Sequence, residues 1–257
     1  MNSIKKMMLS GALGCLISGM AYADGSSPQP VKPYWQDIQV VAVNKEKPRS
    51  SFMSYADRET ALTSRFEKSP YYSLLNGTWK FFFVDSYKDL PQNITDPSVN
   101  TSSWDDITVP GNWEVQGHGV AIYTNHGYEF KPKNPQPPLL PEANPVGVYR
   151  RDIEIPASWD NRDIYLHIGG AKSGLYVYLN GKEVGYSEDS KNPAEFLINK
   201  YLQPGKNVLT LNIFRWSTGS YLECQDFWRM SGIERDVFLW SQPKASIQDF
   251  RVVSTLD

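Results

Sequence analysis

Residues 163–186 read DIYLHIGGAKSGLYVYLNGKEVGY and contain three short segments in which an apolar side chain recurs at every second position. In the first two segments these side chains are Ile164, Leu166, Ile168, Leu175, Val177 and Leu179. Successive side chains of a strand point to opposite faces, so this period predicts strands with one buried face. Between the second and third segments, Asn180-Gly181 favours a type I′ hairpin turn, because both central positions of that turn need a positive φ.

The same alternation recurs through most of the chain after residue 75. It is found at residues 79–83, 149–155, 208–213 and 235–240, and Pro204-Gly205 marks a turn before the third of these. One short helix is predicted at residues 57–67, where Asp57 can cap the N-terminus. Several short strands joined by turns, with almost no helix, predict an all-β antiparallel β-sandwich of the jelly-roll kind.

The composition is typical of a globular protein. The 257 residues are 40% hydrophobic and 13% aromatic, which is enough for a substantial core in one large domain. The formal net charge is -2, and no run of Lys and Arg occurs. Nucleic acids and anionic membranes are bound by basic patches, so the sequence excludes both as partners.

The first 23 residues have the layout of an export signal. Lys5 and Lys6 precede an apolar run at residues 7–20, and Ala21-Tyr22-Ala23 has the small-x-small pattern of a cleavage site. The run is too short to span a bilayer. We therefore expect a signal peptide at 1–23 and a periplasmic or extracellular protein. As an alternative, Cys15 after Leu13-Gly14 could accept a lipoprotein anchor.

Cysteine and histidine do not form a catalytic or metal-binding set. Cleavage of the signal would leave Cys224 as the one cysteine, so no intrachain disulfide could form. A catalytic thiol needs an activating histidine, and the three histidines (His118, His126 and His167) are widely spaced. Without further cysteines they also make a poor zinc set.

Three long segments lack a clear strand pattern. Residues 24–74 begin with a polar leader and continue as an extended arm with aromatic anchors, which could lie on its own domain or on a partner subunit. Residues 110–145 and residues 219–237 are two insertions that we expect to be free of strands, and the prolines of the first lie at positions 132, 135, 137, 138 and 141. Loops this long are usually functional or docked on a neighbour.

Residues 219–237, GSYLECQDFWRMSGIERDV, interleave charged and aromatic side chains. Unpaired buried charge is costly, so we expect these charges to pair with one another and to face a ligand. After a linker-like break, residues 244–257 begin another strand pattern. We expect them to be the first strand of a truncated immunoglobulin-like domain, since one strand cannot bury its own face.

Several motifs, in this order, resemble the N-terminal sugar-binding domain of family 2 glycoside hydrolases, and most of all that of the large bacterial β-galactosidases. They are Leu75-Asn76-Gly77-Thr78-Trp79-Lys80-Phe81, Val109-Pro110-Gly111-Asn112-Trp113, Ile122-Tyr123-Thr124-Asn125, Asn144-Pro145-Val146-Gly147, Phe214-Arg215-Trp216 and residues 219–237. The resemblance implies a jelly-roll, galactose-binding-like domain at 75–243, followed by an immunoglobulin-like domain and a catalytic (β/α)8 barrel.

The chemistry implied by the resemblance is retaining glycoside hydrolysis by two carboxyl groups of the barrel, so no catalytic residue is expected in this chain. Asn134 matches a family asparagine that reaches the galactose subsite. Asp226 matches an aspartate that contacts the sugar and binds a sodium ion (Na+). Magnesium ions (Mg2+) are implied mostly through the barrel. Alternatively, Asp226 forms a salt bridge with Arg229 or Arg235, and Asn134 is a turn residue before proline.

Two further alternatives concern residues near Asp226. Glu223 and Asp226 could form a glycosidase pair, but three residues apart in an irregular segment they are poorly placed for it. Trp113, Trp216 and Trp228 could stack on sugars, although a buried aromatic between sheets is more common.

The function expected from the sequence is the non-catalytic N-terminal portion of an exported β-galactosidase, with a wall of the galactose subsite. The chain alone is expected to hydrolyse nothing. The expected partners are a β-galactoside, the remaining domains of the same enzyme and a possible second subunit. The alternatives are a free-standing carbohydrate-binding module and the same domain of a β-glucuronidase or β-mannosidase.

Overall fold

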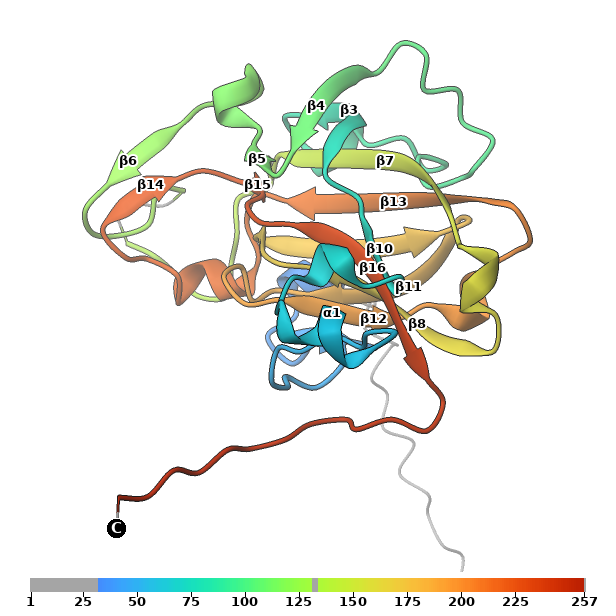
Figure 1. Cartoon of the computed structure of the whole chain (residues 1–257). Helices are drawn as coiled ribbons and strands as arrows, with labels where there is room; N and C mark the ends of the chain where they lie inside the picture. Colours follow the sequence, from blue (N-terminus) through green and yellow to red (C-terminus); the bar gives the residue numbers. More distant parts are fainter. Residues whose placement is uncertain (1–31, 131–133, 257) are drawn as a thin grey trace, which may run out of the picture. The chain divides into compact units, whose positions relative to one another are not determined.

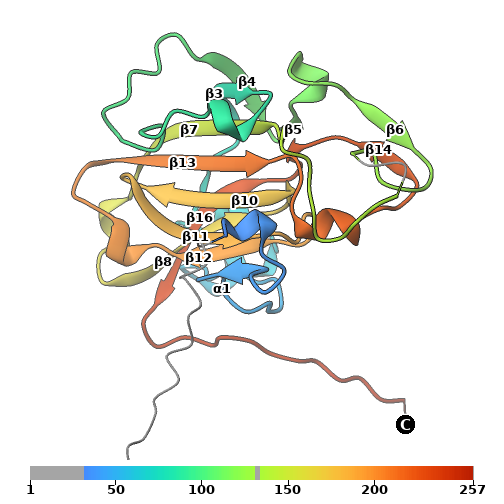
Figure 2. The ribbon, with the colours of Figure 1, turned by 180° about the vertical axis from the view of Figure 1, so that it is seen from behind.

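Two antiparallel sheets lie face to face in the computed structural model, which describes residues 32–130 and 134–256 (Figure 1). The predicted signal peptide and Cys15 lie outside the described residues. The larger sheet has the order β1-β11-β10-β13-β7-β3-β4 and the smaller sheet the order β12-β8-β16-β2. A two-stranded ribbon, β14-β6, and a three-stranded sheet, β5-β15-β9, stand at one end of the sandwich (Figure 2).

The strands of the larger sheet are β1 (Ala42–Val43), β3 (Gly77–Val84), β4 (Asp105–Val109), β7 (Val146–Glu154), β10 (Gly174–Leu179), β11 (Lys182–Ser187) and β13 (Lys206–Phe214). Those of the smaller sheet are β2 (Tyr72–Leu74), β8 (Arg162–Ile168), β12 (Ala194–Leu197) and β16 (Val237–Pro243). The remaining strands are β5 (Gly111–Asn112), β6 (Ile122–Thr124), β9 (Ala171–Lys172), β14 (Phe227–Arg229) and β15 (Gly232–Ile233). One α-helix, α1 (Arg58–Leu62), and seven short 3-10 turns complete the described part: η1 (Tyr34–Gln36), η2 (Phe66–Lys68), η3 (Tyr87–Asp89), η4 (Glu114–Gln116), η5 (Ala157–Trp159), η6 (Asn199–Tyr201) and η7 (Thr218–Tyr221).

The chain crosses between the two sheets repeatedly. It passes from β7 to β8, back to β10, from β11 to β12 and back to β13. Such crossings distinguish a jelly roll from a simple meander. The predicted fold class is confirmed, and the hairpin at Asn180-Gly181 is confirmed as well, with φ of 53° and 76° at its two central residues.

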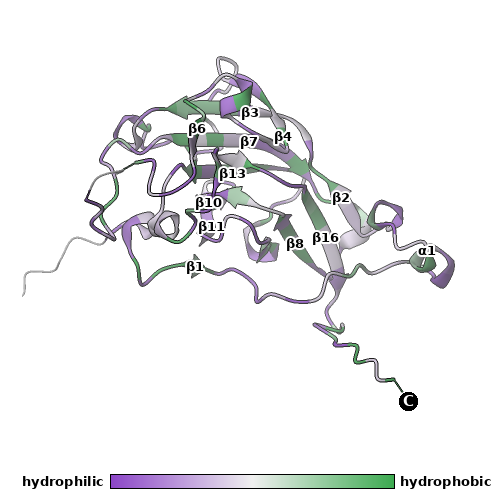
Figure 3. Cartoon of the chain, turned by 90° about the vertical axis from the view of Figure 1, so that its left-hand side faces the viewer, coloured by the Kyte–Doolittle hydropathy of each residue, from purple (hydrophilic) through white to green (hydrophobic). Residues whose placement is uncertain are grey.

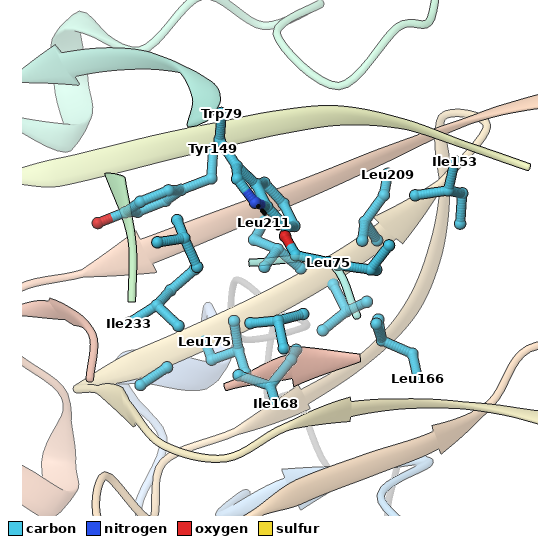
Figure 4. Close-up of a cluster of buried hydrophobic side chains, with 14 of the residues drawn as sticks. Leu75, Trp79, Tyr149, Ile153, Leu166, Ile168, Leu175, Leu209, Leu211 and Ile233 are labelled. Atoms are coloured by element: carbon cyan, nitrogen blue, oxygen red, sulfur yellow. Dashed lines mark hydrogen bonds between the residues drawn. The ribbon is translucent and has the colours of Figure 1, made fainter. Parts of the chain in front are cut away.

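The core lies between the two sheets (Figure 4). Trp79 and Tyr149 from the larger sheet and Leu166 and Ile168 from the smaller one are at most 1% exposed. Burying a large apolar side chain contributes about 2 kcal/mol, so this layer is a main source of stability. Hydrophobic residues are accordingly concentrated in the strands of both sheets (Figure 3).

The arm packs on its own domain. Trp35 is buried and stacks on Phe214 with ring centroids 5.3 Å apart. β1 then extends the larger sheet beside β11, and the chain continues across the outer face of the smaller sheet. There Arg49 lies over the Trp240 ring at 4.3 Å and donates to both carboxylate oxygens of Glu195.

The predicted helix at 57–67 is shorter than expected. Asp57 does cap it, accepting a hydrogen bond of 2.7 Å from the Thr60 N–H, but α1 ends at Leu62 and is followed by Ser64 with φ of 54°. None of its residues is buried, so no apolar face stabilises further turns. Within the described residues no helix is long and apolar enough to cross a membrane.

Residues 244–256 do not form a strand, although their sequence alternates. They are mostly exposed, with Ile247 68% and Val252 77% exposed, and have no strand partner among the described residues (Figure 1). The pattern alone is insufficient because a strand needs a neighbour for its backbone hydrogen bonds. The assignment of this segment to a further domain stays a prediction.

The contact of the arm with β11 leads to a first prediction. A Cβ on Gly185 would collide with the Val43 carbonyl oxygen and lie 2.7 Å from the Phe196 ring. We expect Gly185→Ala to lower the free energy of unfolding by about 2 kcal/mol or more, measured by urea denaturation, and to expose residues 44–52 to protease. Gly205→Ala is the control, since its Cβ would meet nothing within 4 Å and only its φ of 76° costs about 1 kcal/mol. An arm that stays protected in Gly185→Ala contradicts this packing.

The Glu195 cluster leads to a second prediction. Burial acts to raise the pKa of Glu195, but the hydrogen bond from His167 (2.8 Å) and the charge of Arg49 outweigh it, so the pKa lies below its ordinary value of 4.5. Because the pKa is lower in the folded than in the unfolded state, the ionised carboxylate stabilises the fold at pH values above 4.5. This stability is lost as the pH falls through the folded-state pKa. We expect Glu195→Gln to cost about 3 kcal/mol at pH 7. The difference from the unsubstituted chain should shrink below pH 4.5. A difference independent of pH would show that the ionised carboxylate is not the stabilising form.

Candidate functional site

The charged stretch 219–237 is not irregular throughout. It begins within η7, which comes after β13, then forms β14 and β15 and enters β16, so the expectation that it is free of strands was wrong. β14 pairs with β6 from the insertion at 110–145, so the expectation that this insertion is free of strands was wrong. The strands of the insertion have only two or three residues, which is too short for an alternating pattern to be recognised.

The ribbon of β6 and β14 projects from one end of the sandwich (Figures 1 and 2). Asp226 lies at its tip, directly before β14, and its Oδ1 accepts a hydrogen bond of 2.7 Å from the Tyr123 hydroxyl. Tyr123 and Trp228 are cross-strand partners with ring centroids 5.6 Å apart, and they are 55% and 53% exposed. An exposed carboxylate therefore stands beside two exposed aromatic rings.

The register brings a further residue to this tip. Thr124 and Phe227 are partners, so Asn125, which follows Thr124, lies at the same end of the ribbon as Asp226. Asn125 Oδ1 is 2.7 Å from His126 Nδ1, and the residue lies in the exposed part of the loop. Sequence reasoning did not select Asn125 as a site residue. The signal that could have found it is the Tyr123-Thr124-Asn125 motif.

Asn134 lies elsewhere in the same insertion. It is exposed and has a φ of 52°, in the left-handed region that asparagine tolerates at turns. No hydrogen bond joins it to Asp226 within the described residues. Its backbone conformation fits the turn interpretation, and a role of Asn134 in sugar binding stays a prediction.

The alternative that Asp226 forms a structural salt bridge is not supported. Arg229 is 1% exposed, lies 3.8 Å from Glu129 and donates to the Glu223 carbonyl. Arg235 donates to the carbonyl oxygens of Gly169 and Lys191. Neither arginine forms an ion pair with Asp226 in the part of the chain that the structure describes, so this carboxylate is free to contact a ligand.

The charges beneath the ribbon are paired, mostly with residues outside the stretch itself. Glu129 accepts a hydrogen bond of 3.0 Å from Trp216 Nε1 and faces Arg229. Glu114, whose side chain is fully buried, accepts from the Ser231 N–H and lies 3.6 Å from Arg215. Burial raises the pKa of Glu114, while these donors oppose the shift. The expectation that the charges of the stretch pair with one another was wrong. Within the described residues their side chains find partners in other segments, such as Glu129 for Arg229 and Lys191 for Glu234.

Of the three tryptophans that could stack on a sugar, two are buried and one is exposed. Trp113 is fully buried and Trp216 is 9% exposed, so both belong to the interior. Trp228, 53% exposed, is the one of the three that can stack on a ligand. Glu223 accepts two hydrogen bonds from Ser190, at 3.0 and 2.6 Å, and is therefore engaged in holding the segment rather than in catalysis.

Cys224 does not have the properties of a catalytic thiol. The Cys224 thiol donates to the Ser220 carbonyl at 3.1 Å, and burial raises its pKa, which opposes formation of a thiolate. The described residues contain no group of three or more His, Cys, Asp or Glu side chains that could hold a metal ion. Asp226 can offer one carboxylate oxygen to a hard cation and could form only part of such a site.

A jelly-roll sandwich with an exposed carboxylate, an amide and two exposed aromatic rings at one end has the features of a carbohydrate-binding β-sandwich domain. Comparison with known families agrees. The family described as "Glycosyl hydrolases family 2, sugar binding domain" matches residues 72–243. The chain belongs to this family.

Curated relatives are similar over most of this chain. A β-galactosidase of Priestia megaterium is 41% identical over 228 residues, which are 88% of this chain and 22% of that protein. A β-galactosidase of Psychromonas ingrahamii is 39% identical over 223 residues, which are 87% of this chain and 21% of that protein. The chain thus spans about a fifth of the length of the curated relatives it matches.

A solved structure supports the fold. A Bacteroides uniformis β-glucuronidase 2, covalently bound to cyclophellitol-6-carboxylate aziridine, superposes with a TM-score of 0.51 at 24% identity. The match covers 67% of this chain and 18% of that one.

The contact between Tyr123 and Asp226 can be tested by titration. The hydrogen bond to Asp226, and then its charge, raise the pKa of the Tyr123 phenol above the ordinary 10.0. We expect Asp226→Asn to lower this pKa toward 10.0, measured from the tyrosine 13Cζ resonance. Asp106→Asn, at an exposed carboxylate that pairs with Lys80, should leave the pKa unchanged. A Tyr123 pKa that does not respond to Asp226→Asn would mean that the contact is absent in solution.

Proposed function

We propose that this chain is the N-terminal, non-catalytic sugar-binding part of an exported β-galactosidase and supplies one wall of its galactose subsite. The observation that supports it best is the exposed Asp226 at the tip of the β6–β14 ribbon, which forms no ion pair in the described part of the chain. The similarity of the chain to β-galactosidases, at up to 41% identity over 228 residues, favours galactose over other sugars.

The residues of the tip have complementary roles. Asp226 accepts hydrogen bonds from sugar hydroxyls, and the bond from Tyr123 fixes one of its oxygens while leaving the other free. The amide of Asn125 both donates and accepts, as a hydroxyl does. The exposed Trp228 ring offers a flat apolar surface to a C–H face of the sugar. Asn134 is a further candidate for sugar contact, from the proline-rich loop.

The catalytic carboxyl groups are not assigned to this chain. Retaining hydrolysis needs two carboxyl groups about 5 Å apart across a cleft, and the acidic residues described near Asp226, Glu129 and Glu223, are engaged in other contacts. The proposal therefore places both in another part of the protein, together with most of the ligands for Mg2+. For Na+, Asp226 would be the ligand from this chain.

Further aspects of the proposal concern location and partners. The layout of residues 1–23 supports export, with lipid attachment at Cys15 as the alternative. The partners proposed are the β-galactoside, the remaining domains of the enzyme and possibly a second subunit. A second candidate function is a free-standing carbohydrate-binding module, favoured by the exposed aromatic pair Tyr123 and Trp228.

The proposal can be tested with a chimera in which this chain replaces the matching 228 residues of the Priestia megaterium β-galactosidase. We expect the chain alone to hydrolyse no aryl β-galactoside and the chimera to hydrolyse it. Asp226→Ala in the chimera should raise KM about 10- to 100-fold, the loss for a hydrogen bond to a charged group.

Asp106→Asn, on β4 and outside the ribbon, serves as the control and should leave KM unchanged. Turnover by the chain alone, or an Asp226→Ala chimera that behaves like its parent, would falsify the proposal. Saturable binding of galactose by the isolated chain at sub-millimolar concentration would favour the free-standing module, because one wall of a subsite should bind only weakly.

A further inference from the structure

A buried carboxylate lies near the ribbon without a cationic partner. Glu188 is 3% exposed and forms no ion pair within the described ranges 32–130 and 134–256. Its Oε1 accepts from the Tyr186 hydroxyl at 2.7 Å, and its Oε2 accepts from the Thr218 hydroxyl and the Gly219 N–H, both at 2.8 Å. Burial raises the pKa of this carboxyl, and the three donors partly offset the shift.

These bonds connect three parts of the chain. Glu188 directly follows β11, and its own N–H donates to the Val41 carbonyl of the arm at 3.1 Å. Its side chain holds Thr218 and Gly219, where the segment that leads to Asp226 begins. The residue is thus a junction between the larger sheet, the arm and the sugar-facing segment.

A second attachment lies two residues farther along the same loop. The Ser190 N–H and hydroxyl both donate to the Glu223 carboxylate. The loop after β11 therefore holds the segment at Gly219 and again at Glu223. Asp226 is only three positions after Glu223, and such a span reaches at most about 10 Å, which limits how far Asp226 can move.

The packing around Glu188 and Tyr186 is tight. A Cβ added to Gly219 would lie 3.3 Å from Glu188 Oε2, and one added to Gly174 would lie 3.1 Å from the Tyr186 hydroxyl. The neighbouring hydroxyls of Ser173, Ser217 and Ser220 hydrogen-bond one another in the interior. The start of the 219–226 segment is therefore held by Glu188 on one side and by the serine hydroxyls on the other. Such hydrogen bonds depend on distance and direction.

We propose that Glu188 is a positioning residue of the sugar site. Through Thr218 and Gly219 it fixes the start of the 219–226 segment, and together with the Ser190–Glu223 contact it holds Asp226 at the tip of the ribbon. The inference rests on the proposed function for its consequence in sugar binding, but the positioning itself can be measured without any sugar.

The experiment is hydrogen–deuterium exchange of the full chain with variants at Glu188. In Glu188→Ala the Gly219 N–H loses its acceptor, and we expect amides 219–226 to exchange about 10-fold faster or more, with β10 and β13 unchanged. In Glu188→Gln the amide oxygen can accept from Thr218 and Gly219, and the NH2 group can donate to the Tyr186 oxygen. Exchange in this variant should stay within about 2-fold of the unsubstituted chain.

Two further variants separate positioning from general loss of stability. Gly219→Ala presses on Glu188 from the other side and should loosen the same amides. Asn207→Ala removes a fully buried side chain that bonds Gln203 and Gly205 at the start of β13, the opposite end of that strand from Phe214. It should lower stability without loosening residues 219–226.

Normal exchange of 219–226 in Glu188→Ala would overturn the proposal, and so would equal loosening by Asn207→Ala or by Glu188→Gln. In the chimera, Glu188→Ala should raise KM about 5-fold or more and Glu188→Gln should restore it, whereas an unchanged KM in Glu188→Ala would overturn the link to the sugar site. If the unsubstituted chimera hydrolyses nothing, the proposed function fails while the exchange result still decides the role of Glu188.

Discussion

The ribbon that carries Asp226 stands on a layer of buried charge, and every charge in that layer has to be satisfied within the protein. An unpaired buried ion is far more costly than a surface one, so Arg229 and Arg215 can be tolerated only where Glu129 and Glu114 meet them. Both glutamates come from the insertion at 110–145. The insertion is therefore held in place by the arginines that follow β13, and β6 is brought against β14.

This constraint explains why one carboxylate remains free among so many. Glu223 is held by Ser190, and Asp236 accepts from the Asn76 side chain. Glu234 pairs with Lys191. Asp226 differs because its hydrogen-bond donor is the Tyr123 hydroxyl at the exposed tip of the ribbon rather than a residue outside the ribbon. A neutral donor at the surface orients the carboxylate while leaving its negative charge available, which is what a hydroxyl-rich ligand or a hard cation requires.

Most of the sandwich could be predicted because its strands bury one face, and the apolar residues at every second position show which face is buried. The Asn180-Gly181 hairpin could be predicted because few residues accept a positive φ at two successive positions. The β6–β14 ribbon could not. Three-residue strands carry no period, and their pairing depends on ion pairs between residues about 100 positions apart, which no local pattern encodes. For the same reason Asp226 was selected as a candidate from its motif, whereas Asn125 became a candidate only from the strand register.

The position of Glu188 shows how such a non-local site can still be held firmly. A loop between strands would ordinarily be mobile, since its backbone groups bond mainly to water. Here the loop after β11 instead supplies the acceptor for the Gly219 N–H and the donors for the Glu223 carboxylate. β11 lies in the larger sheet beside β10, whose other neighbour, β13, leads into the same segment. The loop that carries Glu188 and the segment that carries Asp226 thus both begin at strands paired with β10. A shift in the register of these strands would therefore displace both.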